Sequence, residues 1–307
     1  MRQADKWKRG LPYAGSKGQK ADKIIDLLPS GDKLLDLFGG GGSISLTAAD
    51  SGKWDQVVYN DIRGSVVKLL KSLITDSKLE LLDYVYITRD EFIDWRDNRP
   101  DSIERTLVLI CWSFGNNMHD YLWGRRVESE KLLLTRAMFF GDTETAYDDI
   151  FKKYHGTGSI HDTYAYYHQW RLAEMGMQSK SDSLQRLQQL QQLQQLQQLE
   201  RLERLQQLEQ LQWLEWLRFS VLDYRDLEIE ENDVVYLDPP YIDSGNQYDG
   251  FDHAAFHKWL LDCPAKNIYI SEYTKLPHTE VAFNLGKKQS FTAVGRRHDE
   301  LLLKVVK

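Results

Sequence analysis

Short apolar runs alternate with amphipathic stretches near the N-terminus of the chain. Their spacing predicts a helix over 19–28, a strand over 33–38, a helix after residue 43, a strand over 56–61 and a helix over 64–74. Strands that alternate with helices in this way are typical of an α/β unit with a parallel sheet. We therefore expect the chain to begin with such a unit.

The same alternation returns after residue 218. The pattern predicts strands over 219–222, 233–237, 267–271 and 300–306, and a helix over 252–262. Between the two α/β parts, the chain is rich in aromatic and charged residues and is predicted to be mostly helical. We expect a split α/β domain at 1–90 and 218–307, an inserted domain at 91–178 and a repeat segment at 179–217.

Leucine recurs at every third position from Leu184 to Leu217, separated mainly by glutamine. No proline or glycine interrupts the segment, so an α-helix is allowed. The leucine stripe would drift around an α-helix, whereas a 3₁₀-helix would align every leucine on one face. Because long 3₁₀-helices are uncommon, we favour the α-helix and keep the 3₁₀-helix open, while a heptad coiled coil fits poorly. The segment is either a spacer without chemistry or a surface for self-association.

Composition excludes several classes of protein. Hydrophobic residues make up 42% of the 307 residues and charged residues 28%, and no run of 18 apolar residues predicts a membrane span. The N-terminus lacks the apolar core of a signal peptide, and two cysteines suggest no disulfide framework, so we expect a soluble cytoplasmic protein. The net charge of −7 argues against a nucleic-acid partner on average. Basic residues nevertheless cluster at 6–20 and 286–298, where each cluster is a solvated face or a nucleic-acid footprint.

Four glycines follow the first predicted strand, in the stretch "LLDLFGGGGSISL". Glycines let a chain turn tightly beside a ligand, and ligands of open α/β sheets lie beyond the carboxyl ends of the strands. The next strand ends in Asp61, and an acid at this place can accept hydrogen bonds from ribose hydroxyls. Alone, the glycines could form a plain turn and Asp61 could cap a helix, but together they favour a nucleoside-containing cofactor.

A rigid corner follows the predicted strand over 233–237, formed by Asp238, Pro239, Pro240 and Tyr241. The exocyclic amine of a nucleobase is a poor nucleophile because its lone pair is delocalised into the ring. Asp238 and the carbonyl of Pro239 could accept both amine hydrogens and aim the lone pair at a methyl donor, with the prolines fixing the geometry. Tyr241 offers a ring on which an extruded base could stack. The alternative is a proline loop with a capping aspartate.

Together these motifs resemble the Dam-like DNA adenine N6-methyltransferases, in the alpha arrangement, over about two-thirds of the chain. The resemblance implies a Rossmann-like sheet with helices on both faces, at 1–90 and 218–307, and a target-recognition domain at 91–178. It implies S-adenosylmethionine as cofactor, no metal, base flipping and double-stranded DNA as partner, in a bacterial or phage-infected cell. "YAGSK", "DLFGGGGS", "NDI" and "DYRDL" imply a set of cofactor-binding residues: Tyr13, Lys17, Asp36, Phe38, Gly40, Gly42, Asp61, Asp223 and Tyr224. "DPPY" implies the catalytic residues Asp238, Pro239, Pro240 and Tyr241.

The stretch "WSFGNNMHDYLWGR" (112–125) departs from the family pattern, so no target sequence is assumed. Residues here and in the C-terminal basic cluster are predicted to bind DNA, or else to pack the insertion or end a helix: Asn116, Asn117, Tyr121, Arg125, Arg126, Arg296 and Arg297. Because some ribosomal RNA enzymes also carry "DPPY", an RNA adenine methyltransferase stays an alternative. A non-catalytic nucleic-acid-binding or oligomerisation module is the other one.

Overall fold

The computed structural model describes residues 10–75, 81–125, 128–129, 131–132, 135–136, 215–241, 250–287 and 299–307. The chain divides into two units, of which the first takes residues 1–78, 101–106 and 204–307 and the second takes 79–100 and 107–203.

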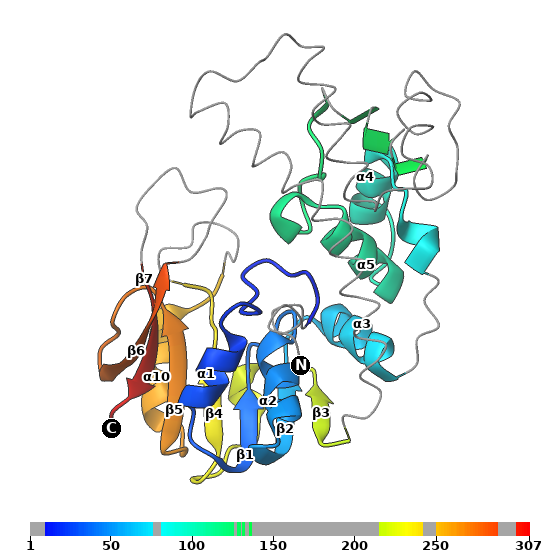
Figure 1. Ribbon diagram of the computed structural model, residues 1–307. Helices are drawn as coiled ribbons and strands as arrows, with labels where there is room; N and C mark the ends of the chain where they lie inside the picture. Colours follow the sequence, from blue (N-terminus) through cyan, green and yellow to red (C-terminus); the bar gives the residue numbers. More distant parts are fainter. Residues whose placement is uncertain are drawn as a thin grey trace, which may run out of the picture. The chain divides into compact units, whose positions relative to one another are not determined.

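The first unit contains a seven-stranded sheet in the order β3-β2-β1-β4-β5-β7-β6 (Figure 1). The five strands from β3 to β5 in this order run parallel, whereas β7 is antiparallel to both of its neighbours. The strand order reverses between β1 and β4, which is where ligands bind in open α/β sheets. The bounds of the strands are β1 (Gly31–Asp36), β2 (Trp54–Asn60), β3 (Leu217–Ser220), β4 (Val234–Leu237), β5 (Asn267–Glu272), β6 (Thr279–Lys287) and β7 (Asp299–Val305).

The central strands are apolar on both faces, as expected for parallel strands covered by helices. All four residues of β4 are buried, and Asp36 of β1 lies in register with Tyr236 of β4. In Figure 1, α1 and α2 lie in front of the sheet and α10 lies behind it. The α-helices whose described residues lie wholly in this unit are α1 (Ala21–Leu27), α2 (Ser43–Ser51), α3 (Gly64–Thr75) and α10 (His253–Asp262). Apolar side chains of α10 pack on those of β1, β4, β5 and β7 in one buried cluster.

The second unit has an aromatic core in its described part. Trp112 and Tyr121 stack at 6.3 Å between ring centroids, and Phe92 and Trp123 pack against Tyr121. The Trp112 indole donates a hydrogen bond of 2.7 Å to the carbonyl of Tyr84. The described helices in this part of the sequence are η2 (Leu81–Tyr84), α4 (Arg89–Asp97), α5 (Ile103–Cys111), whose first residues count with the first unit, and η3 (Phe114–Asn116).

The seven-stranded sheet and its helices confirm a mixed α/β fold consistent with a methyltransferase. Some details differ from the sequence prediction. The predicted strands at 33–38 and 219–222 both lie two residues earlier, at Gly31–Asp36 and Leu217–Ser220, and the strand predicted from residue 56 begins at Trp54. β6 is an additional strand that the sequence pattern does not predict. The helix predicted for 179–217 does not reach Leu217, because Glu215 and Trp216 form a turn and Leu217 begins β3. The rest of the leucine repeat lies outside the described residues, and the predicted recognition domain at 91–178 stays a prediction.

Candidate active site

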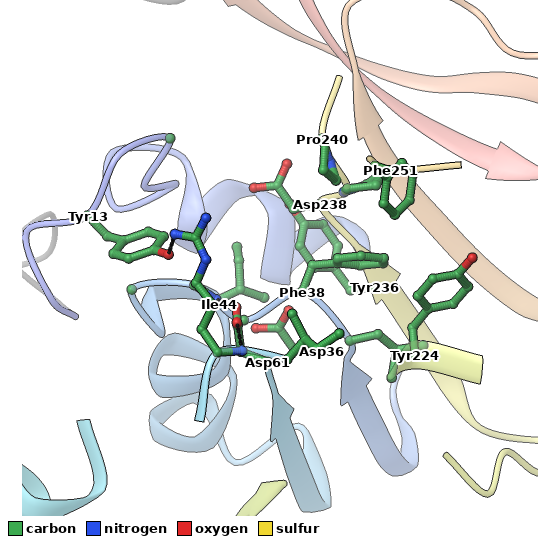
Figure 2. A pocket seen from close by; sticks show the side chains of 18 of the residues that line it. Tyr13, Asp36, Phe38, Ile44, Asp61, Tyr224, Tyr236, Asp238, Pro240 and Phe251 are labelled. Carbon is green, nitrogen blue, oxygen red and sulfur yellow. Dashed lines mark hydrogen bonds between the residues drawn. The ribbon is translucent and has the colours of Figure 1, made fainter. Parts of the chain in front are cut away.

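A cavity of about 700 Å³ lies at the carboxyl ends of β1, β2 and β4, within the first unit (Figure 2). It is lined by residues that are far apart in the sequence, from Tyr13 to Tyr273. Parallel strands bring their carboxyl ends to one edge, which explains why the acids that follow β2 and β4 meet the last residue of β1 there. Five aspartates line the cavity, and Asp36, Asp61 and Asp238 are the three at the ends of these strands, beside Asp223 and Asp252.

The glycine loop after β1 follows the end of β2 closely. Gly39 N–H donates to the carbonyl of Asn60 at 2.8 Å, and the Tyr59 hydroxyl donates to the carbonyl of Gly40 at 2.7 Å. A Cβ on Gly39 would lie 2.2 Å from the Tyr59 ring, so no larger residue fits there without displacement. The Gly40 N–H in turn donates to an Asp61 carboxylate oxygen at 2.9 Å. The loop therefore holds the carboxylate of Asp61 in place through a backbone hydrogen bond.

The N-terminal element lies directly on this loop. Leu11 N–H donates to the carbonyl of Gly41 at 2.7 Å, and the ring of Tyr13 covers Gly40. Arg63 donates a hydrogen bond of 2.7 Å from its guanidinium to the Tyr13 hydroxyl, as Figure 2 shows. The segments 13–17, 38–41 and 61–63 thus line the cavity together.

Asp36 is almost completely buried, with 1% of its surface exposed. Ser45 donates a hydrogen bond of 2.7 Å to Oδ2, whereas Oδ1 has no hydrogen-bond partner in the described part of the chain. Burial raises the pKa of Asp36 to about 7, and the charges of Asp238 and Asp61 add to this rise. Burial also raises the pKa of Asp61, against the backbone N–H groups of Arg63 and Gly40.

The corner after β4 places Asp238 beside a lysine. Lys17 Nζ lies 2.5 Å from Asp238 Oδ2, and the Asp238 side chain is 19% exposed. Burial raises the pKa of Asp238, while the ammonium of Lys17 opposes that rise. Burial also disfavours the charged form of Lys17, but Asp238 and Glu300 outweigh it and raise the pKa of Lys17. Lys17 therefore stays an ammonium beside Asp238.

Tyr241 ends the corner with its ring largely buried. Its hydroxyl donates a hydrogen bond of 2.8 Å to Glu300 Oε1, and its ring meets that of Tyr273 edge-on at 4.5 Å between centroids. Pro239 is buried and Pro240 half-buried beside it. The side chain of Tyr241 lines the cavity from a fixed position.

An aromatic group lines the cavity beside the β1 loop. The rings of Phe38, Tyr224 and Phe251 pack with centroids 5.3 to 6.1 Å apart. Asp223 caps the short helix η5 (Tyr224–Asp226) and accepts two hydrogen bonds from the guanidinium of Arg225, at 2.7 and 2.8 Å. Its carboxylate is thus already engaged within its own turn.

The structure brings together every predicted cofactor-binding and catalytic residue except Gly42, which precedes α2 at a left-handed φ of 81°. Lys17, predicted for the cofactor, lies on Asp238, the predicted catalytic acid. Several lining residues are absent from the prediction: Arg63, Tyr236, Phe251 and Tyr273. Arg63 directly follows the motif "NDI" and Tyr236 lies two residues before "DPPY", so the motifs could have pointed to both positions. No motif adjoins Phe251 or Tyr273.

The predicted DNA-binding residues are described only in part. Tyr121 is 8% exposed and donates a hydrogen bond of 2.7 Å to the carbonyl of Ile87, so it packs the second unit. Asn116 donates to the carbonyl of Ile110 at 3.0 Å, and Asn117 donates to Asp120 at 2.8 Å. Arg125 is exposed. Arg126, Arg296 and Arg297 lie outside the described residues, and DNA contact stays a prediction for the whole set.

Residues 13–110 match the model of a protein family, the D12 class N6 adenine-specific DNA methyltransferases. This match confirms the resemblance to Dam-like adenine methyltransferases, and it covers the N-terminal element, the glycine loop and Asp61. The matched segment stops before Asp238, so the family match does not cover the corner after β4. No curated protein matches the chain. None of the helices in the described ranges has the length and apolarity that a membrane span needs.

Proposed function

We propose that this chain transfers a methyl group from S-adenosylmethionine to N6 of an adenine in double-stranded DNA. One observation carries the proposal: the carboxylate of Asp238, on a proline-stiffened corner, opens into the same cavity as the glycine loop, Asp36 and Asp61. A donor bound on the loop and an amine bound on Asp238 would share this cavity. The family match supports adenine as the target and DNA as its carrier.

The residues of the cavity fit S-adenosylmethionine. The ligand carries an ammonium, and the buried Oδ1 of Asp36 is an acceptor without a partner among the described residues. Asp61 lies at the end of β2, where a carboxylate can accept ribose hydroxyls. Phe38 and Tyr224 offer apolar rings, while Asp223 has its carboxylate on Arg225 and can contribute through its backbone. When bound, S-adenosylmethionine supplies an electrophilic methyl group on its sulfonium.

Asp238 would act by hydrogen bonding and not as a proton store. One carboxylate oxygen is held by Lys17, which leaves Oδ1 to accept a hydrogen from the adenine amine. The Pro239 carbonyl would accept the other hydrogen, so the nitrogen lone pair points away from the ring plane. Fixed acceptors of this kind favour the transition state because they need no reorganisation. The lone pair would attack the methyl carbon while the C–S bond breaks and sulfur keeps its electron pair, and the extra proton of N6 would then pass to solvent water.

An adenine within a duplex must leave the stack to reach a cavity of this kind. Tyr241 lines the cavity and is held by Glu300 and Tyr273, so it offers a fixed ring beside Asp238. The flipped base would stack there. DNA would be held through basic residues outside the cavity, with an affinity that falls as salt rises. An adenine in RNA is the second candidate substrate, because the chemistry at Asp238 is the same.

The test uses purified wild-type protein and the Asp238→Ala variant with unmethylated duplex DNA and S-adenosylmethionine. The products are digested to nucleosides and weighed by mass spectrometry. We expect N6-methyladenine from the wild type and at least about a thousandfold less from the variant, with cofactor binding retained by both. Transfer to RNA alone would move the proposal to the second substrate. No modified base from either nucleic acid would favour a binding module.

A further inference from the structure

Glu300 is a buried carboxylate that contacts neither proposed ligand in the transfer. It lies on β7 with 1% of its surface exposed, far along the chain from the corner at Asp238. A charge is almost never buried so deeply unless it is paired and hydrogen-bonded. Its partners are therefore informative about why it is there.

Both oxygens of Glu300 are engaged by groups around the catalytic corner. Oε1 accepts the hydroxyl of Tyr241 at 2.8 Å and lies 3.3 Å from Lys17 Nζ. Oε2 lies 2.7 Å from Lys20 Nζ, and Lys20 also donates to the carbonyl of Gly286 on β6. Lys17 in turn lies on Asp238. The carboxylate of Glu300 thus contacts Lys17, the partner of Asp238, and the hydroxyl of Tyr241. It also contacts Lys20, which is bonded to the edge strand β6.

We propose that Glu300 is a positioning residue, which holds the Lys17 ammonium and the Tyr241 ring in place around Asp238. The Lys17 ammonium lies between the carboxylates of Asp238 and Glu300. It therefore holds Oδ2 of Asp238 in place, while Glu300 attracts it from the other side. The Tyr241 hydroxyl is anchored on the same oxygen, so the ring and the ammonium are set by one group. An error of about 1 Å in such a placement can cost a hundredfold in rate.

Charge balance explains why this device needs a carboxylate. Lys17 and Lys20 face Asp238 and Glu300, so two ammonium groups meet two carboxylates. In a Glu300→Gln variant, the amide oxygen could still accept from Tyr241, but the amide NH₂ would face Lys20, and both groups are donors. Removing the charge would also leave Lys17 with Asp238 as its remaining carboxylate among these contacts. Lys17 would then hold Asp238, the proposed acceptor for the adenine amine, more tightly than in the wild type.

The inference rests on the proposed function, and its test measures kcat, cofactor affinity and a pH profile together. The variants are Glu300→Gln and the matched control Glu280→Gln, an exposed glutamate on the neighbouring strand β6. For Glu300→Gln we expect kcat on DNA to fall at least about tenfold. The dissociation constant of S-adenosylhomocysteine, measured by calorimetry, should stay within about twofold of the control.

The pH profile separates positioning from a loss of folded protein. The groups that act on Asp238 are Lys17, Glu300, Tyr241, Tyr236 and Asp36. Removing the negative charge of Glu300 favours ionisation of Asp238, so the acid limb of the kcat profile should move to lower pH. Partial unfolding would lower the whole profile without moving that limb.

Tyr241→Phe tests the same contact if Glu300→Gln does not fold. It removes the hydroxyl bond but keeps the two ion pairs of Glu300, and we expect kcat to fall about fivefold, the size expected for one lost hydrogen bond. Unchanged kcat in both variants, beside an active wild type, would overturn the inference alone. A wild type without transfer to DNA or RNA would overturn the proposed function and the inference with it.

Discussion

The carboxylates at the two ends of the cavity have different partners within the protein. Asp238 has an ammonium from the protein itself, at 2.5 Å, and Glu300 behind it has a second one from Lys20. Asp36 has a serine hydroxyl on one oxygen and, among the described residues, no hydrogen-bond partner on the other. A cation of the protein thus compensates the negative charge of the carboxylate at the Asp238 end. Among the described contacts, none does so at the Asp36 end.

This difference supports the ligand that the proposed function places at each end. A buried carboxylate without a cation is unfavourable in the folded protein, so a cationic ligand gains from neutralising it. S-adenosylmethionine would be such a ligand, with its ammonium and sulfonium groups. The adenine amine is neutral and would need only an acceptor, which Asp238 beside Lys17 would supply.

The largest effect is expected for Lys17→Met, which removes the cation from the Asp238 end. Breaking a buried ion pair by removing one partner leaves an uncompensated charge and costs about 3 to 5 kcal/mol of stability. Lys68→Met, at an exposed site on α3, is the control. Chemical denaturation measures the free energy of unfolding, and nucleoside mass spectrometry measures transfer. A Lys17→Met variant with unchanged stability and full transfer at neutral pH would contradict the role given to the pair.

Asp36→Asn tests the other end, with an effect of opposite sign on stability. The folded pKa of Asp36 is raised from 3.8 to about 7, so its favourable contribution is present below pH 4 and is lost as pH rises through 7. Linkage gives about 1.4 kcal/mol for each pH unit between the unfolded and the folded pKa, so the ionised acid disfavours the folded state by on the order of 4 kcal/mol at pH 8. We expect Asp36→Asn to be more stable than the wild type at pH 8 and nearly equal at pH 4.

The same variant should bind the cofactor at least about a hundredfold more weakly, because the acceptor for its ammonium loses its charge. Calorimetry with S-adenosylmethionine measures the affinity, and thermal unfolding at pH 4 and pH 8 measures stability. Gain of stability with loss of binding identifies Asp36 as a site kept for its ligand. An Asp36→Asn variant that binds as tightly as the wild type would remove the contrast between the two ends.

Most of the sheet and most of the cavity could be predicted from the sequence, for local reasons. The strand before Asp238 is a continuous apolar run, and the glycines after β1 and the prolines after β4 mark sharp turns. The strand β6 escapes prediction because its residues, "TEVAFNLGK", mix polar and apolar positions, and its ladder with β7 is irregular after Val281 and Asn284. Glu300 escapes prediction as a site residue because its partners are brought to it only by the tertiary fold.

The side chain of Lys17 is a second case in which the sequence does not predict a contact. Its motif predicts a cofactor element, and the loop that carries it does lie on the glycine turn. The direction of one long side chain is set by the charges around it, and here two carboxylates from β7 and the β4 corner decide it. Local sequence predicts the position of the backbone at this site but not the partner of the ammonium.

A smaller effect is expected from Gly42→Ala, beside the Asp36 end. Gly42 and Gly52 both have left-handed φ angles, of 81° and 64°. A Cβ on Gly42 would lie 2.5 Å from Leu70 Cδ2, whereas one on Gly52 would meet nothing within 4 Å. Gly52→Ala should therefore cost about 1 kcal/mol for its backbone alone, and Gly42→Ala about 2 kcal/mol. Equal unfolding free energies for both variants would show that Leu70 yields freely.

The smallest effect is expected at Tyr13, which covers the glycine loop at the Asp36 end. Tyr13→Phe removes an exposed hydrogen bond from Arg63 and keeps the ring over Gly40, so cofactor affinity should change less than about threefold. Tyr13→Ala removes the ring as well, and we expect affinity to fall about tenfold because apolar area over the loop is lost. Calorimetry on both variants separates hydroxyl from ring. If Tyr13→Phe bound the cofactor as weakly as Tyr13→Ala, the hydroxyl and its hydrogen bond to Arg63 would be the important contact. This end of the cavity would then hold its ligand by polar contacts and not by packing of the ring.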